Sequence, residues 1–161
     1  MRQSVQQGLW CVLPAILVTA GWAANDVAVP SACTPSVNEK LAQLISSGQQ
    51  EAVDNVMVCG TTASSSRRQR GGEHGDHQIL PLRVTLPDGS MKLIEVVTND
   101  DLDGKVTAPA NASVFAYGQA FFSRTQQFAA GVHEVHCATH RGADNGWVVV
   151  NGEKHPASCS R

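Results

Sequence analysis

The amino-acid sequence predicts a mainly β protein, a small barrel of antiparallel strands with one short N-terminal α-helix. Three observations lead to this prediction. One stretch near the N-terminus repeats apolar residues at helical spacing, and the chain after it alternates apolar and polar residues. Pro, Gly, Asp and Asn separate the alternating stretches at strand-like intervals. Closing such a sheet into a barrel removes strand edges that a domain of this size could not otherwise cover.

The first 23 residues have the pattern of a secretory signal peptide. Arg2 gives a short charged start, an apolar run extends from Gly8 to Ala20, and the small residues Gly21 and Ala23 fit a cleavage site after Ala23. The run is too short to span a bilayer comfortably, and no later stretch approaches the roughly 18 apolar residues of a membrane helix. We therefore expect a periplasmic or secreted mature protein without a transmembrane segment.

Length and charge limit the function classes. The chain has 161 residues, enough for one domain, and a formal net charge of −2. Removal of Arg2 with the signal peptide leaves −3, which excludes a globally cationic nucleic-acid binder but not a local basic patch. We expect a lead-in and helix over residues 24–51, a barrel domain over 52–161, and a monomer.

Four cysteines remain after cleavage, and in an oxidising compartment four cysteines predict two disulfides. Sequential pairing, Cys33–Cys59 and Cys137–Cys159, is favoured because each bond ties a terminal segment to a nearby strand. A bond between Cys59 and Cys137 is the alternative if their strands are neighbours.

The helix begins near Pro35-Ser36 and ends at Gly48. Ser36 followed by Glu39 predicts a capping box, and glycine is a common residue just after a helix. An apolar stripe at helical spacing faces the sheet, formed by Val37, Leu41, Leu44 and Ile45.

Five main strands and a closing hairpin follow. Turn signals at Pro87–Ser90 and at Asn151-Gly152 predict two hairpins. The expected strands cover residues 52–61, 78–86, 91–97, 113–122 and 132–139, with a final pair at 147–150 and 153–155. One helix and five strands in this order favour an OB-like barrel.

The order of motifs resembles an uncharacterised bacterial family of small exported proteins, domain of unknown function 3465. The counterparts lie between about residues 52 and 156. They are His77-Gln78, the Pro87–Ser90 turn, Asn99 to Leu102, His136 to His140, and Gly146-Trp147 with Asn151-Gly152. Cys137 stands in place of the family's Trp and Thr139 in place of a His. Because the family has no established activity, the resemblance implies export and fold and transfers no catalytic residue.

Histidines raise the question of a metal site. On a strand over 132–139, alternation places Glu134, His136 and His140 on one face, and His77 enters a neighbouring strand. A Glu with such histidines could bind zinc or another divalent metal. The favoured interpretation is a solvated polar strand face, so no cofactor is expected, and the alternative is a metal site at His77, His136 and His140.

A basic loop is the second candidate site. Arg67, Arg68 and Arg70 precede the second strand, and the segment 123–131 contains Arg124 and Phe128. In an OB-like barrel these two loops flank the ligand-binding face. Arginines around an aromatic ring suit an anionic chain, whereas a solvated loop is the plainer interpretation. Trp147 could stack on a sugar or base, although a buried core position is favoured.

The favoured function is a non-enzymatic binding module for an unknown ligand, with an anionic polymer such as nucleic acid or acidic glycan as the candidate. The first alternative is a metal-dependent hydrolase acting on phosphodiesters, centred on His77, His136 and His140. The second alternative is a structural or partner-binding envelope protein. No sequence motif of a nucleophilic hydrolase supports an enzyme with a catalytic Ser or Cys.

Overall fold

The computed structural model describes residues 24–71, 75–123 and 125–159. The predicted signal peptide, residues 1–23, lies outside the described residues, as does Arg124. Within the described part of the chain, no helix combines the length and apolar character needed to cross a membrane.

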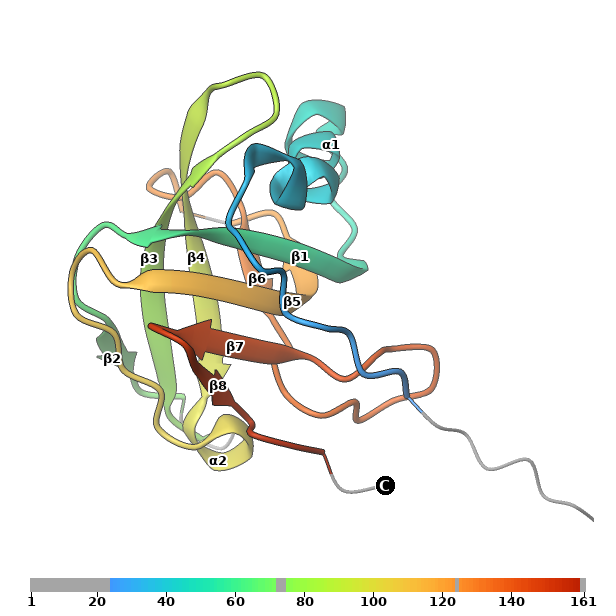
Figure 1. Cartoon of the computed structure of the whole chain (residues 1–161), viewed down its shortest axis with the longest axis vertical. Coiled ribbons are helices and arrows are strands. Elements are labelled where there is room, and N and C mark those ends of the chain that lie inside the picture. Colours follow the sequence, from blue (N-terminus) through green and yellow to red (C-terminus); the bar gives the residue numbers. More distant parts are fainter. Residues whose placement is uncertain (1–23, 72–74, 124, 160–161) are drawn as a thin grey trace, which may run out of the picture.

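The described residues form a closed β-barrel with one short helix, which confirms the predicted fold class (Figure 1). The strands follow one another around the barrel in the order of an OB-like Greek key, and the last pairs back with the first. In that order they are β1 (Val53–Thr62), β3 (His77–Thr85), β4 (Met91–Asn99), β6 (Gly131–His133) and β5 (Ser113–Phe121).

One junction of the barrel is parallel. β4 and β6 run in the same direction, with Glu95 opposite Gly131 and Val96 opposite Val132. The other strand pairings are antiparallel. Among them are the two hairpins that the sequence predicted, β3 with β4 and β7 with β8. Hairpin turns predict which consecutive strands pair, and they carry no information about the two strands that complete a barrel.

Three short strands extend the sheet. β2 (Arg67–Gln69) adds to β3, so part of the predicted basic loop is a strand. β7 (Trp147–Val150) pairs with β5, and β8 (Glu153–His155) returns along β7 through the predicted Asn151-Gly152 turn. The bounds of β7 and β8 confirm the predicted closing hairpin.

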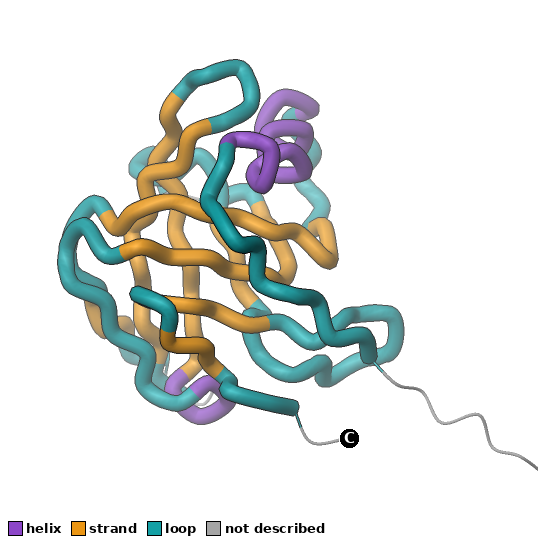
Figure 2. The backbone as a smooth tube through the Cα atoms, viewed as in Figure 1, coloured by secondary structure: helices purple, strands orange, loops and turns teal. Residues whose placement is uncertain are grey.

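The helix covers one end of the barrel, opposite the one-turn helix α2 (Asp100–Asp103) (Figure 2). A 3-10 turn, η1 (Pro35–Asn38), leads into α1 (Glu39–Ser47), which ends at Gly48 with a left-handed φ of 65°. Leu41 and Leu44 are buried in the core, as their spacing predicted.

The predicted capping box is wrong. The Ser36 hydroxyl lies 2.9 Å from that of Thr34 and makes no cap hydrogen bond. The side chain of Asn38 instead accepts from the Cys59 amide at 2.8 Å and donates to the Thr85 carbonyl at 2.9 Å. The buried side-chain amide of Asn38 therefore fixes the start of the helix to β1 and β3, in place of a local cap.

Both disulfides have the predicted sequential pairing. Cys33–Cys59 attaches the N-terminal segment to β1, and Cys137–Cys159 attaches the segment after β6 to the C-terminal segment. Two disulfides fit a protein that folds in an oxidising compartment.

The predicted strand over 132–139 is wrong beyond its second residue. β6 ends at His133, and Glu134 has a left-handed φ of 52°. A non-glycine residue in this conformation breaks the alternation of side chains along a strand. The argument that placed Glu134, His136 and His140 on one strand face therefore does not hold.

Candidate functional site

A groove of about 710 Å³ crosses the barrel between the two loops that the sequence predicted to flank the ligand face. The first loop contributes β2 and Gly71, and the second contributes Ser123 and Thr125. Side chains of β3, β4 and β5 complete the groove, among them His77, Ile79, Val97 and Phe121.

The three arginines of the first loop differ in their contacts. Arg67 and Arg70 line the groove, whereas Arg68 forms an ion pair with Asp76. The hydrogen bond from Arg68 lowers the pKa of the Asp76 carboxyl, and the same bond raises the pKa of Arg68. Arg67 takes part in none of the ion pairs among the described residues. Arg67 and Arg70 are therefore the cations best placed to meet a ligand.

One acid also lines the groove. Glu95 on β4 is 9% exposed, and its Oε1 accepts a hydrogen bond from the Ser123 hydroxyl at 2.9 Å. This bond holds the start of the second loop against the barrel wall. The described lining thus carries two arginines against one buried carboxylate.

The aromatic residues at the groove are not those that the sequence singled out. Phe128 and Trp147 are 4% and 1% exposed and do not line it. Trp147 donates its indole N–H to the Val27 carbonyl at 2.9 Å and stacks against Tyr117. Phe121 and Phe122 line the groove in their place. Their position at the end of β5, beside the second loop, was the sequence signal that could have identified them.

A smaller polar cavity of about 150 Å³ adjoins the groove, and His77 lines both. Its other polar side chains are Asn99, Asp103, His133, Glu134 and His136. Two of the predicted metal ligands, His77 and His136, therefore share one cavity.

Asp103 is the most unusual group in this cavity. It is 6% exposed, its Oδ2 accepts from the Asn99 amide at 2.6 Å, and its Oδ1 has no hydrogen-bond partner among the described residues. Burial raises the pKa of this carboxyl. Burial likewise lowers the pKa of His133, whose Nε2 lies 2.8 Å from the Gln119 Oε1.

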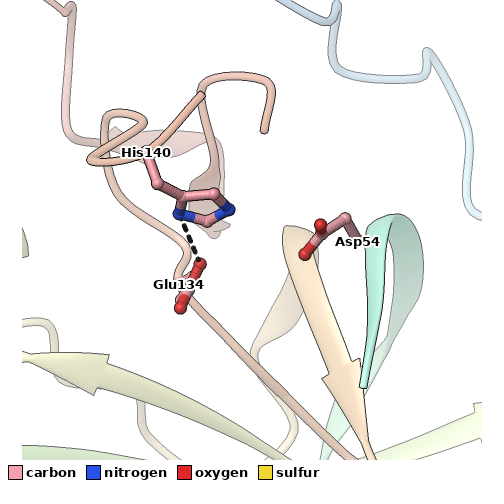
Figure 3. Close-up of side chains that lie close together, drawn as sticks. All are labelled: Asp54, Glu134 and His140. Atoms are coloured by element: carbon pink, nitrogen blue, oxygen red, sulfur yellow. Dashed lines mark ion pairs between the residues drawn. The ribbon is translucent and has the colours of Figure 1, made fainter. Parts of the chain in front are cut away.

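His140, the third predicted ligand, lies in a different cluster. Its Nδ1 is 3.7 Å from the Glu134 Oε2, and Asp54 faces the pair from β1 (Figure 3). One ligand atom from each of these three residues lies within 4.8 Å of the others. Among the described residues, Asp54, Glu134 and His140 are therefore the three potential metal ligands that lie close enough to share one ion. His77 and His136, which the sequence predicted as ligands, do not belong to this group.

Local backbone features position this cluster. Asp54 lies at an irregularity in the pairing of β1 with β5, between Val53 and Val56, where Asn55 has a left-handed φ of 60°. Such a bulge turns a side chain away from the regular alternation of the strand. The sequence contains no local signal for this bulge, so Asp54 was not predicted as a site residue.

The motifs that carry the predicted resemblance to the exported bacterial family include His77, His136 and Gly146. The structure places His77 and His136 on one cavity and Gly146 next to Glu134, and the resemblance itself stays a prediction. A search of protein-family models, curated proteins and solved structures finds no match to this chain.

Proposed function

We propose that this protein is a periplasmic or secreted binding module that takes an anionic chain, such as single-stranded nucleic acid or an acidic glycan, into the groove between β2 and the segment after β5. The observation that supports the proposal most is that the two loops border one continuous groove. Its volume is within the range of about 300–1,000 Å³ that is typical of ligand sites.

The lining suits a flexible chain with negative charges. Arg67 and Arg70 can pair with phosphates or carboxylates, and the rings of Phe121 and Phe122 offer surfaces for bases or sugars. Ile79 and Val97 supply an apolar floor between the two. Charge on one side and aromatic rings on the other match the way proteins bind single strands without sequence preference.

The salt dependence of binding tests this proposal. We expect a fluorescent oligothymidylate and a sulfated glycan to bind, and the Arg67→Ala/Arg70→Ala variant to bind more weakly. For the oligonucleotide, loss of two phosphate contacts reduces the slope of log K against log salt by about 1.4.

Arg68→Ala is the matched control, because Asp76 already neutralises Arg68. The control keeps the slope of the unmodified protein. Equal slopes for the double variant and the unmodified protein would contradict the proposal, as would absence of binding to both probes.

A metal-dependent hydrolase is the second candidate. The observation that favours it is that His77 borders both the groove and the cavity that contains the buried Asp103. A chain in the groove would pass next to that cavity. Cleavage of a phosphodiester probe that requires a divalent metal and is reduced at least about tenfold in His77→Gln would support it. Cleavage that needs no metal, or absence of cleavage, would contradict the hydrolase, and the binding module would remain as the proposed function.

A further inference from the structure

We infer that Asp54, Glu134 and His140 form a binding site for one divalent transition metal ion, of which Zn²⁺ fits the ligand set best. The site differs from the predicted trio of histidines, and it does not depend on the groove. Its ligands are two carboxylate oxygens and one imidazole nitrogen (Figure 3). Imidazole and carboxylate are both ordinary zinc ligands, and zinc sites with three protein ligands keep a fourth position open for water.

The distances are close to those of a formed site. Ligands about 2.0–2.1 Å from a tetrahedral zinc lie about 3.4 Å from one another. The His140 Nδ1 and the Glu134 Oε2 are 3.7 Å apart, and the whole set lies within 4.8 Å. His140 is exposed, so rotation of its side chain can shorten the longer distances in the set.

The three ligands come from separate parts of the chain that are fastened together. Asp54 lies on β1, Glu134 directly follows β6, and His140 lies in the loop before β7. The Asp144 amide in this loop donates to the Asn55 side chain at 3.2 Å, next to Asp54. The loop is therefore held against β1 next to one of the ligands.

The ends of the same loop are also joined. The Gly146 amide donates to the His136 carbonyl at 2.8 Å, and the Ala138 amide donates to the Asn145 side chain at 3.0 Å. The Cys137–Cys159 disulfide holds the beginning of the loop. A loop closed in this way places His140 with little loss of entropy when a metal binds.

A second layer of hydrogen bonds orients Asp54. The Gln119 Nε2 donates to the Asp54 Oδ1 at 2.6 Å, and the Gln119 Oε1 lies 2.8 Å from the His133 Nε2. Partners of this kind fix the orientation of a metal-binding carboxylate in known metal sites. The Asp54 Oδ2 has no hydrogen bond to another described residue, which leaves it available to a metal.

A small cavity next to the cluster has the size of a single ligand. It measures about 10 Å³ and is lined by two of the three proposed ligands, Asp54 and Glu134, together with His136, and His140 does not line it. This volume corresponds to about one water molecule. The cavity is thus an observation, separate from the distances, that indicates space for a water molecule beside the two carboxylates.

The electrostatics favour a cation. The carboxylates of Asp54 and Glu134 lie close together in this cluster. Among the described residues, the ion pair that the cluster contains joins Glu134 to His140. His140 must be neutral to bind a metal through nitrogen. A divalent ion would then balance the charge of the two carboxylates.

Zinc titration of protein purified without a histidine tag and stripped with a chelator tests the site. Calorimetry should show one Zn²⁺ bound per chain. His140→Gln, Glu134→Gln and Asp54→Asn should each weaken the affinity more than about 100-fold, and Gln119→Ala about 10–100-fold. His155→Gln is the matched control, because His155 lies 3.5 Å from Glu153 without a third ligand and should bind zinc as the unmodified protein does.

A readout on the unmodified protein guards against variants that fail to fold. Zinc should shift the NMR signals of the His140 ring more than those of His155. Absence of saturable zinc binding would overturn the inference, and so would shifts confined to His77 and His136. Unchanged affinity in a folded His140→Gln variant would overturn it as well.

Discussion

The backbone of Glu134 lies against Gly146 so closely that a methyl group on Gly146 would come within 2.2 Å of the Glu134 carbonyl oxygen. On another side, a methyl group on Gly118 would lie 2.3 Å from the His133 carbonyl oxygen and 3.0 Å from that of Glu134. Two glycines therefore give room to the turn in which β6 ends and Glu134 adopts its left-handed conformation.

We predict that Gly118→Ala lowers the free energy of unfolding by more than about 2 kcal/mol, because the added methyl group must displace rigid backbone. Gly89→Ala is the control. Gly89 has a φ of 81° and no atom within 4 Å of the added methyl, so only about 1 kcal/mol of conformational strain is expected. Urea denaturation measures both values. Equal losses would mean that the turn can shift to accept a side chain.

The two disulfides provide a matched pair of variants. They span similar sequence separations, 26 and 22 residues, so loss of either bond should destabilise the protein by about 3 kcal/mol. Only Cys137–Cys159 holds the loop of His140. We therefore predict that Cys137→Ser/Cys159→Ser weakens zinc binding and that Cys33→Ser/Cys59→Ser does not, under conditions where both variants remain folded. Calorimetry with zinc measures the affinity of each variant. Equal affinities in the two variants would show that the Cys137–Cys159 bond does not support the metal site.

His133 predicts a loss of stability in mild acid. Burial lowers its pKa, so below the unfolded-state value of about 6.5 the unfolded chain binds the proton more readily than the folded protein. The contribution of neutral His133 is complete above that pH and decreases as the pH falls. Denaturation between pH 7 and pH 5 should show a steeper loss for the unmodified protein than for His133→Gln. Parallel curves would contradict the assignment.

Asp103 predicts the opposite slope. Burial raises its pKa, so above the unfolded-state value of about 3.9 the folded protein retains the proton that the unfolded chain releases. Stability is then lost as the pH rises from about 4 through the raised pKa. Asp103→Asn cannot ionise and should gain stability relative to the unmodified protein over that range. Chemical denaturation at pH 4 and pH 7 gives the difference, and a constant difference would show that Asp103 ionises freely.

The elements that could be predicted from the sequence are those that depend on neighbouring residues. Asn151-Gly152 predicts its hairpin because few residues adopt the tight turn, and the Leu41 and Leu44 spacing predicts the buried side of α1. The disulfide pairing could be predicted because both bonds join segments close in the sequence. The parallel contact of β4 with β6 depends on residues about 35 positions apart, and local patterns do not encode it.

The candidate site shows the same limit. His140 and Glu134 belong to the histidine-rich stretch that the sequence singled out, but a strand was the wrong reason to bring them together. Their contact depends on the end of β6 at His133, which two distant glycines allow. Asp54 joins them through a bulge and through the pairing of β1 with β5. Phe128 and Trp147 were candidates for ligand stacking because aromatic residues suit both surfaces and cores, and their burial follows from tertiary packing.

The parallel pairing of β4 with β6 also determines how much of the chain must be synthesised before the barrel can close. Val96 finds its partner only when Val132 has been made, so the chain must extend at least to Val132 before the barrel can close. The Cys33–Cys59 bond and the β3–β4 hairpin need no residue beyond Asn99 and can form earlier. Before that point the chain can form only an open, partly paired sheet. We expect its slow step to be the docking of the three-residue strand β6, because long-range pairing slows folding.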